Sequence, residues 1–318
     1  MKVLITGSSG SLGRMLTGYL ISRNIYVVGL DIKNSTERFT EDQFRYHRCC
    51  ITDKERLESI FLEEQPTNVV HFACSFNRIR NRQREYEIDV EGSLNVLEIS
   101  NNTLSVKQLI YSSSAAIYGA HNDNKIWLRE SDYLRPGTYR YGINKKLIER
   151  IYFETVVRHD FHITSLRICQ VVCPSCEKPG SFVSLLGKLP FLPEFCKENK
   201  AQFIHSDDFV KLVGHVLDDT EINGVYNLAP KDFVVIKELV PWKKFIWIPL
   251  SFTTGLLSIL WNLRILNIQP ASLDTGIYSM ILDPSKLILR YGYNFKFSSE
   301  EAFKSTLNIK KVPFKVKD

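Results

Sequence analysis

The chain has few of the features that mark proteins built to bind nucleic acids, metals or membranes. Its net charge is +6 over 318 residues and it has no basic run, so we expect no nucleic-acid partner. Its seven cysteines are an odd number, and the one C-x-x-C pair, Cys173 and Cys176, has no second ligand pair beside it. We therefore expect reduced thiols and no metal site. Glycines follow the first apolar residues too early for a secretion signal, which favours a cytoplasmic protein.

Long hydrophobic runs are also scarce, with one exception toward the C-terminus. Residues 245–261 contain no charged residue and lie between Lys244 and Arg264. This run is at the lower limit for a membrane span, and Pro249 and Gly255 interrupt it. We interpret it as a core or interface helix, in preference to a helix lying on a membrane surface, and we expect no membrane span.

Apolar runs alternate with longer amphipathic segments from the first residues onward. Because short β-branched runs separated by helices form parallel sheets covered on both faces, this order predicts an α/β fold with a doubly wound sheet of the Rossmann type. The looser stretch Pro174–Pro193 predicts an insertion, and Asp207 or Asp208 is the expected cap of a helix at Phe209–Leu217. The other expected helices are residues 12–22, 54–64, 88–100 and one after Tyr139, and the expected strands are residues 3–6, 26–30, 69–73, 108–112, 162–168, 203–204 and 225–228.

A glycine-rich turn joins the first expected strand to the first expected helix. In residues 7–13 (GSSGSLG), Gly7 permits a tight turn, Gly10 lets a ligand approach the backbone, and Gly13 lets the helix pack against the strand. Backbone N–H groups at a helix N-terminus bind the diphosphate of a nucleotide. The turn and its position after a strand therefore predict a dinucleotide-binding site.

Asp31, at the end of the second expected strand, indicates which dinucleotide binds. A carboxylate at this position accepts hydrogen bonds from both ribose hydroxyls and repels a 2′-phosphate, which favours NAD over NADP. In the alternative, Asp31 is a strand-end turn residue that Lys33 neutralises. We expect residues 1–168 with about 202–230 to form the NAD-binding domain. A smaller, discontinuous α/β domain that binds a small-molecule substrate takes about 169–201 and 231–318.

Tyr141 and Lys145 stand four residues apart, so a helix places one above the other. A free phenol has a pKa near ~10 and is a poor base at neutral pH. The Lys145 ammonium and a positive nicotinamide ring both favour the phenolate, and lowering the pKa by about three units requires roughly 4 kcal/mol. Tyr139 is excluded because Ile143 stands four residues after it. The pair predicts a proton-transfer site.

Serines at the end of the fourth apolar strand strengthen this interpretation, since a Y-x-x-x-K pair alone is more often a solvated helix pair. The carboxyl ends of strands in an open α/β sheet face the ligand crevice. A hydroxyl there can hydrogen-bond a substrate alcohol or carbonyl while the tyrosine moves its proton. We select Ser114 as the catalytic residue, whereas Ser112 and Ser113 also suit plain strand-end caps.

With these parts in this order, the chain resembles the NAD-dependent epimerase/dehydratase family, the extended short-chain dehydrogenases, over nearly its whole length. Residues 70–73 (VHFA), 166–167 (LR) and 203–208 (FIHSDD) also match that family's motifs. The serine strand with Ile117-Tyr118-Gly119 is most similar to that of UDP-galactose 4-epimerases. The resemblance implies a homodimer formed through the helices that contain Asp89–Ser100 and Tyr141–Phe153.

The resemblance also implies a set of residues around the cofactor and a smaller set around the substrate. Lys145 holds the nicotinamide ribose in this family, and a residue at the position of Ile168 lies near the nicotinamide. The implied cofactor residues are Gly7, Ser9, Gly10, Ser11, Leu12, Gly13, Asp31, Ile32, Cys50, Ile51, Phe72, Ala73, Cys74, Ser112, Tyr141, Lys145 and Ile168, and the implied substrate residues are Ser75, Ser114 and Gln170.

Departures from the family's pattern narrow the reaction. Ala115 and Ala116 stand where dehydratases place Asp-Glu and where related decarboxylases keep a glutamate, so neither dehydration nor decarboxylation is expected. Cys50 replaces an adenine-contacting aspartate, and Asp89 replaces an asparagine. What remains is hydride transfer on a hydroxyl or keto group, either reversible within one substrate or with net redox change.

Three functions stay open. The serine strand favours an NAD-dependent sugar-nucleotide epimerase. Gln170 stands where many such enzymes have a diphosphate-contacting asparagine, which favours a dehydrogenase or reductase that uses NAD(P) on a less polar alcohol or ketone. Trp242, Trp247 and Trp261 would line the apolar pocket of such an enzyme, unless they belong to the core. A non-catalytic NAD-binding protein is the third function, and the complete Ser114, Tyr141 and Lys145 set argues against it.

Overall fold

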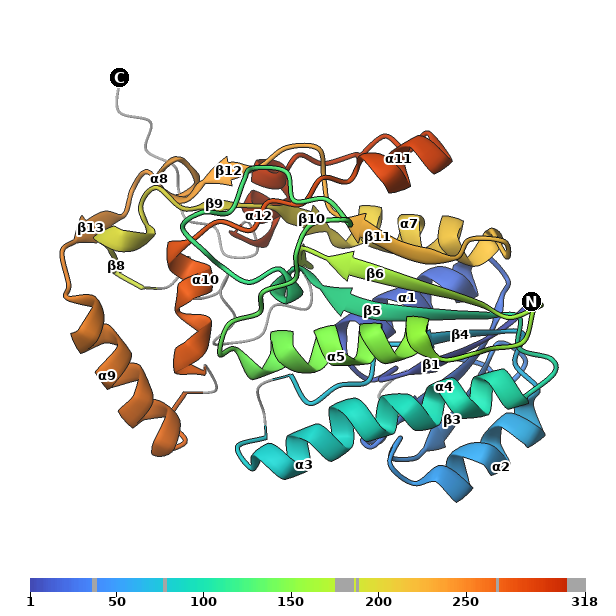
Figure 1. Ribbon diagram of the computed structural model, residues 1–318. Coiled ribbons are helices and arrows are strands. Elements are labelled where there is room, and N and C mark those ends of the chain that lie inside the picture. The colour runs from blue at the N-terminus through green and yellow to red at the C-terminus, as the bar shows by residue number, and fades with distance from the viewer. Residues whose placement is uncertain (36–38, 77–78, 175–185, 187–188, 267–268, 308–318) are drawn as a thin grey trace.

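The computed structural model describes residues 1–35, 39–76, 79–174, 186, 189–266 and 269–307. Within these ranges, seven parallel strands form a central sheet in the order β11-β6-β5-β4-β1-β2-β3 (Figure 1). The expected doubly wound parallel sheet is confirmed. The strands are β1 (Lys2–Thr6), β2 (Tyr26–Asp31), β3 (Phe44–Arg48), β4 (Asn68–His71), β5 (Gln108–Ser114), β6 (His162–Ile168) and β11 (Gly224–Leu228).

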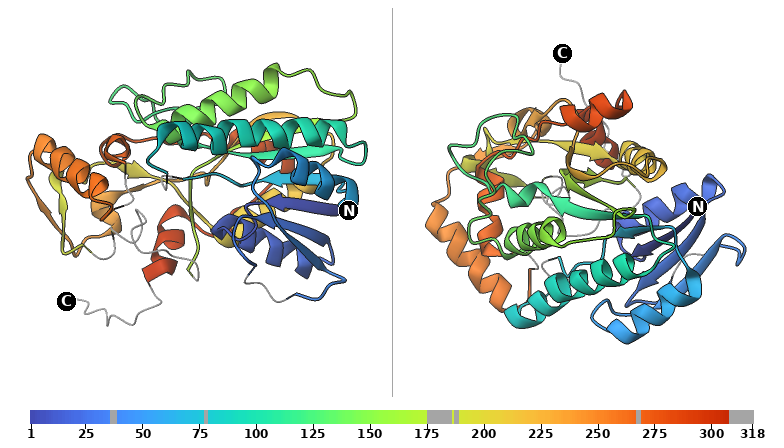
Figure 2. Two further views of the ribbon diagram at one scale, coloured as in Figure 1. Left: turned by 90° about the horizontal axis from the view of Figure 1, so that it is seen from below. Right: turned by 45° about the vertical axis from the view of Figure 1, so that its right-hand side comes forward.

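Helices cover both faces of this sheet (Figure 2). Each face has its own core of buried apolar side chains, contributed by the strands and by the helices that pack on them. On one face lie α1 (Ser11–Ser22) and α7 (Ser206–Asp218); on the other lie α2 (Lys54–Glu64), α4 (Gly92–Asn102) and α5 (Arg140–Glu154), with α3 (Arg82–Tyr86) and a π-helical turn (Glu87–Glu91) leading into α4.

Most elements after β6 gather beyond the carboxyl ends of the strands (Figure 1). They form three two-stranded sheets, among the described residues, around a third apolar core. The sheets pair β7 (Gln170–Val172) with β10 (Phe203–His205), β8 (Phe191–Pro193) with β13 (Lys244–Ile246), and β9 (Lys200–Ala201) with β12 (Val234–Val235). The helices here are α8 (Ile236–Leu239), α9 (Leu250–Asn262), α10 (Asp274–Ile277) and α12 (Ser299–Leu307). The remaining helix, α11 (Ser285–Tyr291), packs beside β11 and contributes Leu287 to a core of the main sheet.

The short strands β7, β8, β9, β12 and β13 were not expected, and β3 and β10 also differ from the expectation. β3 was not expected, because it lies at the edge of the sheet and its sequence, FRYHR, alternates buried and exposed side chains instead of forming an apolar run. The strand expected at residues 203–204 forms as β10 but pairs with β7 outside the main sheet. Most of the expected insertion Pro174–Pro193 lies outside the described residues.

The start of α7 also differs from the expectation. The His205 ring, and not an aspartate, caps this helix by accepting a hydrogen bond from the Asp207 N–H at 3.1 Å. Asp208 is fully buried and accepts hydrogen bonds from the Tyr293 hydroxyl at 2.8 Å and from the Lys296 N–H at 3.0 Å. Asp208 therefore holds the C-terminal part of the chain against α7.

We expected a core or interface helix for the apolar segment 245–261, and the structure excludes only the core position. It forms part of β13 and most of α9, and in α9 only Trp261 is buried. No helix in the described part of the chain is both long enough and apolar enough to cross a membrane.

The cysteines include one that is not a thiol. Cys173 is disulfide-bonded, so the expectation of reduced thiols is wrong for this residue. Cys176 lies outside the described residues. The free thiols are Cys49, Cys50, Cys74, Cys169 and Cys196.

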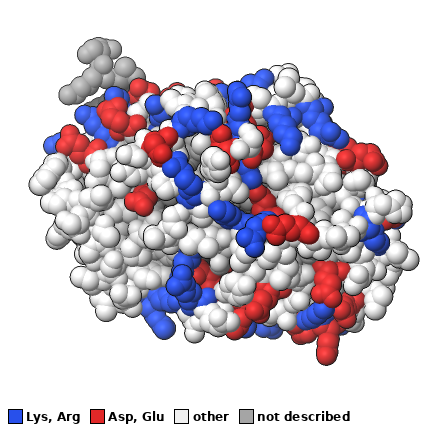
Figure 3. All heavy atoms as spheres, viewed as in Figure 1, with Lys and Arg blue, Asp and Glu red and all other residues white. Residues whose placement is uncertain are grey.

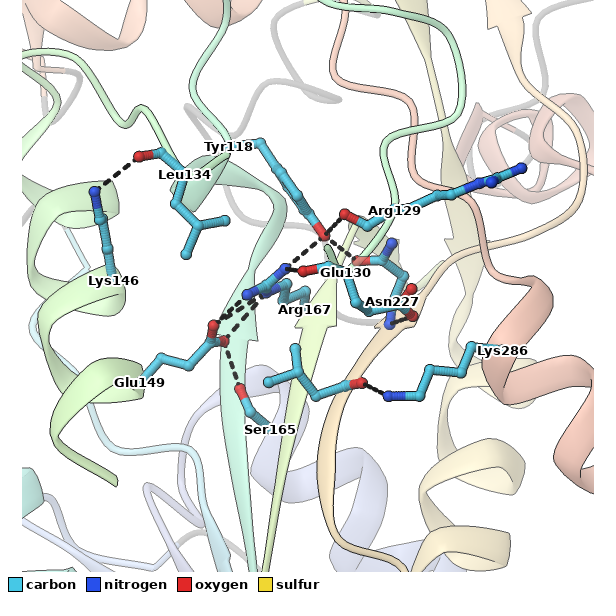
Figure 4. A network of polar contacts seen from close by, with 11 residues as sticks. Tyr118, Arg129, Glu130, Leu134, Lys146, Glu149, Ser165, Arg167, Asn227 and Lys286 are labelled. Carbon is cyan, nitrogen blue, oxygen red and sulfur yellow. Dashed lines mark hydrogen bonds and ion pairs between the residues drawn. The ribbon is translucent and has the colours of Figure 1, made fainter. Parts of the chain in front are cut away.

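A buried ion pair fastens α5 to the sheet (Figure 4). Arg167 on β6 and Glu149 on α5 are both 4% exposed, and the Arg167 Nη2 lies 2.5 Å from the Glu149 Oε1. The Ser165 hydroxyl donates to the Glu149 Oε2 at 2.7 Å. The Arg167 Nη1 donates to the Tyr118 hydroxyl at 2.8 Å, and that hydroxyl donates to the Asn227 Oδ1, also at 2.8 Å. One network therefore joins α5, β6, β11 and the loop after β5.

We expect Arg167→Met to lower the free energy of unfolding by about 3–5 kcal/mol, because it leaves the Glu149 carboxylate buried without its cation. The double variant Glu149→Leu/Arg167→Met removes both charges and should lose clearly less stability. Urea denaturation of the three proteins measures the difference. A double variant as unstable as the single one would contradict a charge-pairing role.

His71 on β4 is fully buried and uncharged. The Ser93 hydroxyl donates to the Asp89 carbonyl, so the His71 Nε2–H donates to the Ser93 Oγ at 2.9 Å. The His71 Nδ1 then accepts from the Thr6 hydroxyl at 2.6 Å. Burial, followed by the nearby Lys145 charge, lowers the pKa of His71 to about 3.

Because the pKa of His71 is lower in the folded state than the ~6.5 of an unfolded chain, only the unfolded state takes up this proton on mild acidification. His71 therefore stabilises the fold fully above about pH 6.5, and this contribution falls by about 1.4 kcal/mol per pH unit below it. We expect His71→Gln to flatten the pH dependence of the unfolding free energy in that window. Equal slopes for both proteins would rule this out.

Candidate active site

The glycine turn after β1 brings backbone atoms closer together than any other residue would allow. Gly7 has a φ of +73°, and a Cβ on it would lie 2.7 Å from the Ala73 N. A Cβ on Gly13 would lie 2.4 Å from the Gly7 carbonyl oxygen. Gly10 is the N-cap of α1, which has no side-chain cap and no acidic residue in its first turn. The positive end of α1 therefore faces the turn, where an anion is favoured.

Asp31 lies beside this turn, as expected. Its Oδ2 accepts a hydrogen bond from the Ser9 N–H and its Oδ1 accepts one from the Lys33 N–H, both at 3.1 Å. Each carboxylate oxygen keeps a further lone pair for a ribose hydroxyl. Tyr46, on the unexpected strand β3, also reaches the turn, with its hydroxyl 3.2 Å from the Ser9 Oγ. Sequence reasoning missed Tyr46 because it missed β3.

The other residues expected around the adenosine differ in exposure. Ile32 follows Asp31 and is 60% exposed, whereas Ile51 is 4% exposed. Cys50 is half-buried, and its Sγ lies 3.1 Å from the Thr52 Oγ1. Ile32 and Cys50 can contact a ligand directly, while Ile51 is a core residue beneath them.

Ser114, Tyr141 and Lys145 come together at the carboxyl end of β5. Ser114 ends this strand directly beside Ile168 at the end of β6, and its hydroxyl hydrogen-bonds the Tyr141 side chain. The Lys145 Nζ lies 5.7 Å from the centre of the Tyr141 ring and donates a hydrogen bond to the Ser112 carbonyl. This arrangement places a hydroxyl, a phenol and an ammonium around one point at the crevice.

Burial dominates the ionisation of this group. Burial raises the pKa of Tyr141 well above its usual range, with Cys74 adding to the increase and the Ser114 hydrogen bond opposing it. Burial also lowers the pKa of Lys145, while nearby Cys74 and Asp89 raise it. The chain's own groups therefore keep the phenol neutral, and the lowered pKa that we predicted depends on the second positive neighbour, the nicotinamide ring.

The residues after β4 connect the glycine turn to the catalytic end. Phe72 is buried against the Phe209 ring, with 6.1 Å between ring centres. The Ala73 N–H donates to the Thr6 Oγ1 at 3.3 Å. Cys74 is half-buried and is close enough to influence the ionisation of both catalytic groups. The residues expected to line the cofactor therefore lie at the carboxyl ends of the strands, between the glycine turn and Tyr141.

Ser75, which we expect near the substrate, is hydrogen-bonded to a buried carboxylate. Asp89 is 3% exposed, and its Oδ1 accepts from the Ser75 N–H at 2.6 Å while its Oδ2 accepts from the Ser75 hydroxyl at 2.9 Å. The Asn144 side chain, next to Lys145 on α5, donates to the same Oδ2 at 3.4 Å. The sequence indicated Asp89 only as a departure from an asparagine, and its role in holding Ser75 emerges from the fold.

Gln170 does not reach the catalytic group. Its side chain is exposed and donates to the Val171 carbonyl at 3.3 Å. A small cavity does lie beside the turn that follows Ser114, and it reaches the loop before Tyr141. No lysine or arginine is among the described residues that line it, which are Ala116, Gly119, Ala120, His121, Pro136, Gly137, Thr138, Tyr139, Ala271, Asp274, Thr275 and Met280. Among the described residues, no cluster of three or more His, Cys, Asp or Glu side chains could hold a metal ion.

The strand order, the glycine turn and the Ser114, Tyr141 and Lys145 group define an extended short-chain dehydrogenase. A model of the NAD dependent epimerase/dehydratase family matches residues 3–229. The chain belongs to this family, and NAD is the family's cofactor. The residues fit it, because the turn and α1 would hold the diphosphate, Asp31 the adenosine ribose and Lys145 the nicotinamide ribose.

Several curated proteins are similar to the chain. UDP-glucose 4-epimerase of Pasteurella multocida is 30% identical over 72% of this chain and 78% of that protein. Vestitone reductase of Medicago sativa is 24% identical over 95% of this chain and 94% of that protein. Protein CapI of Staphylococcus aureus is 27% identical, and the chain spans about half of its length, 55%.

Solved structures share the fold. The UDP-glucose 4-epimerase of Thermotoga maritima, solved with UDP-glucose, has a TM-score of 0.75 at 24% identity and matches 97% of this chain and 98% of that one. The Bordetella bronchiseptica enzyme WbmG, solved with NAD and UDP, has a TM-score of 0.74 at 21% identity and matches 96% of this chain and 92% of that one. Both likenesses extend through the elements after β6.

We expect Asp31→Ser to raise the affinity for NADP relative to NAD by about tenfold or more. The substitution removes the carboxylate, and with it the repulsion between Asp31 and the 2′-phosphate of NADP. Calorimetric titration with each nucleotide measures the ratio. Asp42→Ser removes an exposed acid before β3 and serves as the control. An unchanged ratio in Asp31→Ser would mean that Asp31 is a turn residue only.

Proposed function

We propose that the chain is an NAD-dependent sugar-nucleotide epimerase. The observation that carries this proposal is the pairing of a complete Ser114, Tyr141 and Lys145 group with Ala115 and Ala116, which have no acid–base side chain. Such a site can move a proton and a hydride at one carbon and lacks adjacent groups for eliminating water. The similarity to UDP-glucose 4-epimerases supports the same class of substrate.

Tyr141 performs the proton transfer in this proposal. When bound, NAD would supply the hydride acceptor and donor for the carbon that carries the reacting hydroxyl. Tyr141 takes the proton from that hydroxyl as the carbon–oxygen double bond forms, and returns it when the hydride comes back to the opposite face. Ser114 hydrogen-bonds both Tyr141 and the substrate oxygen, which orients the oxygen toward the phenol. The atoms balance, and the cofactor ends in its starting state.

Lys145 supports Tyr141 through charge and position. Its hydrogen bond to the Ser112 carbonyl fixes the ammonium close to the Tyr141 ring. The Arg167 and Glu149 pair lies one turn further along α5 and keeps this helix at a fixed distance from β6. A phenolate formed in this dry site is therefore stabilised by a cation that does not have to move into place.

A second candidate is an NAD-dependent reductase or dehydrogenase of a less polar alcohol or ketone. The small cavity beside Ser114 has no cation among its described lining residues, and Gln170 hydrogen-bonds its own neighbour. A sugar-nucleotide diphosphate is better held by cations. The similarity to vestitone reductase over nearly the whole chain also supports this candidate.

We further propose a homodimer through α4 and α5 in the cytoplasm. The ends of these helices carry exposed apolar side chains, with Phe153 39% and Val156 92% exposed, and Tyr86 before α4 is 38% exposed. A second copy would cover them.

We expect the purified enzyme to convert one UDP-sugar of a UDP-hexose panel into its epimer with no net formation of NADH. Because Tyr141 moves the proton, Tyr141→Phe should lower kcat by about 10²–10⁴-fold and leave NAD affinity unchanged. Chromatography of the nucleotide sugars and NADH absorbance give both readouts.

Tyr133→Phe, at a residue 91% exposed, is the matched control and should keep full activity. Net NADH turnover with an apolar alcohol or ketone, and no sugar epimer, would favour the second candidate. If Tyr141→Phe kept the wild-type rate, both mechanisms would be wrong.

A further inference from the structure

The segment from Trp242 to Ile265 exposes an unusual amount of apolar surface. Trp247 is 74% exposed, and Phe252, Leu263 and Ile265 are each more than 60% exposed. Monomeric soluble proteins rarely expose large contiguous apolar patches without a binding role. The exposed large apolar residues of this segment are Trp242, Ile246, Trp247, Leu250, Phe252, Leu256, Ile259, Leu263 and Ile265.

α9 presents its apolar stripe outward. Phe252, Leu256, Ile259 and Leu263 follow one another at intervals of four, three and four residues, which places them on one face of the helix. All four are exposed, between 44% and 64%. The buried residue, Trp261, lies on the opposite face. Leu257 and Leu260, which are half-buried, and Trp261 pack toward the protein, so α9 has apolar residues on its outward face in addition to those that an ordinary surface helix buries.

The rest of the protein holds α9 in this orientation. Arg80 stacks on the Trp261 ring with its guanidinium 4.4 Å from the ring centre. The Arg80 Nε donates to the Trp261 carbonyl at 3.0 Å, which fixes the C-terminal end of the helix. The exposed stripe is therefore a fixed surface of the folded protein.

The charged residues of the segment that carries this stripe have one sign. Between Glu238 and Asp274 the only charged residues are Lys243, Lys244 and Arg264. The surface over α9, at the lower left of Figure 3, is a broad area without charged side chains. An apolar face bordered by cations and tryptophans is typical of a helix that lies in the headgroup region of an anionic bilayer.

We infer that α9 docks the protein on the surface of a membrane that contains anionic lipids. The stripe of Phe252, Leu256, Ile259 and Leu263 enters the boundary between headgroups and acyl chains, parallel to the surface. Lys244 and Arg264, both exposed, pair with lipid phosphates at the two ends of the helix. Trp247 lies at headgroup level, where its ring is partly solvated.

A second copy of the chain fits this face less well. In a twofold dimer, the same patch of both copies meets at the interface. Lys244 and Arg264 of one copy would therefore lie close to Lys244 and Arg264 of the other. In the described part of the chain, the segment between Glu238 and Asp274 provides no acid to neutralise them. Anionic lipids supply that negative charge over the whole face.

The test is co-sedimentation of the full chain with vesicles. We expect binding to vesicles of equal parts phosphatidylglycerol and phosphatidylcholine, and much weaker binding to pure phosphatidylcholine. Leu256→Ser/Ile259→Ser should weaken binding at least about tenfold, because less apolar area is buried. Lys244→Gln/Arg264→Gln should weaken it by about 25-fold, at roughly fivefold per cation, and high salt should also weaken binding of the wild type.

Leu104→Ser/Leu289→Ser is the matched control, since these leucines are 75% and 82% exposed on other surfaces. It should bind the vesicles like the wild type. Circular dichroism and catalytic rate in solution verify that every variant is folded, and light scattering gives its oligomeric state. Absence of binding to the anionic vesicles, or equal weakening in the control, would overturn the inference. If the α9 variants separated a dimer and bound vesicles normally, the face would belong to a second copy.

Discussion

The buried pairing of Arg167 with Glu149 is the contact on which the geometry of the site depends. Both groups are almost completely buried, and hydrogen bonds from the Ser165 hydroxyl to Glu149 and from Arg167 to Tyr118 occupy their remaining polar atoms. A buried charge pair tolerates little displacement, because separation leaves each ion without water. The pair therefore fixes α5 against β6, and with it Tyr141 and Lys145, which α5 carries.

The site that results combines a rigid cofactor side with a buried proton-transfer group. The glycine turn that leads into α1 has backbone contacts that leave no room for a Cβ at Gly7 or Gly13. Asp31 is held beside this turn by a hydrogen bond from the Ser9 N–H. Around Tyr141, burial keeps the phenol neutral until a second positive charge arrives with the cofactor. Proton transfer is thereby coupled to the presence of the group that takes the hydride. Asp89 adds an organising role by fixing the loop after β4 through Ser75.

The elements after β6 lie beside Ser114 and carry the exposed apolar segment. They form the walls beyond Ser114, and they carry the outward-facing stripe of α9 together with the cations that border it. Both features are built on short strands and helices that pack beside the main sheet. Arg80, from the segment between β4 and α3, contacts Trp261 and holds the end of α9. The catalytic group and the proposed membrane face therefore belong to one packed body.

The sequence alone determined the doubly wound sheet, the glycine turn and the Ser114, Tyr141 and Lys145 group, because each follows from local periodicity, strand ends or helix spacing. It did not show β3, whose alternating edge sequence lacks an apolar run, nor the His205 cap or the bond between Asp89 and Ser75. It also left open whether α9 is a core or an interface helix, since an apolar run gives no sign of which face is covered. Those outcomes were decided by the tertiary structure, because burial, ion pairing and outward orientation depend on segments far apart in the chain.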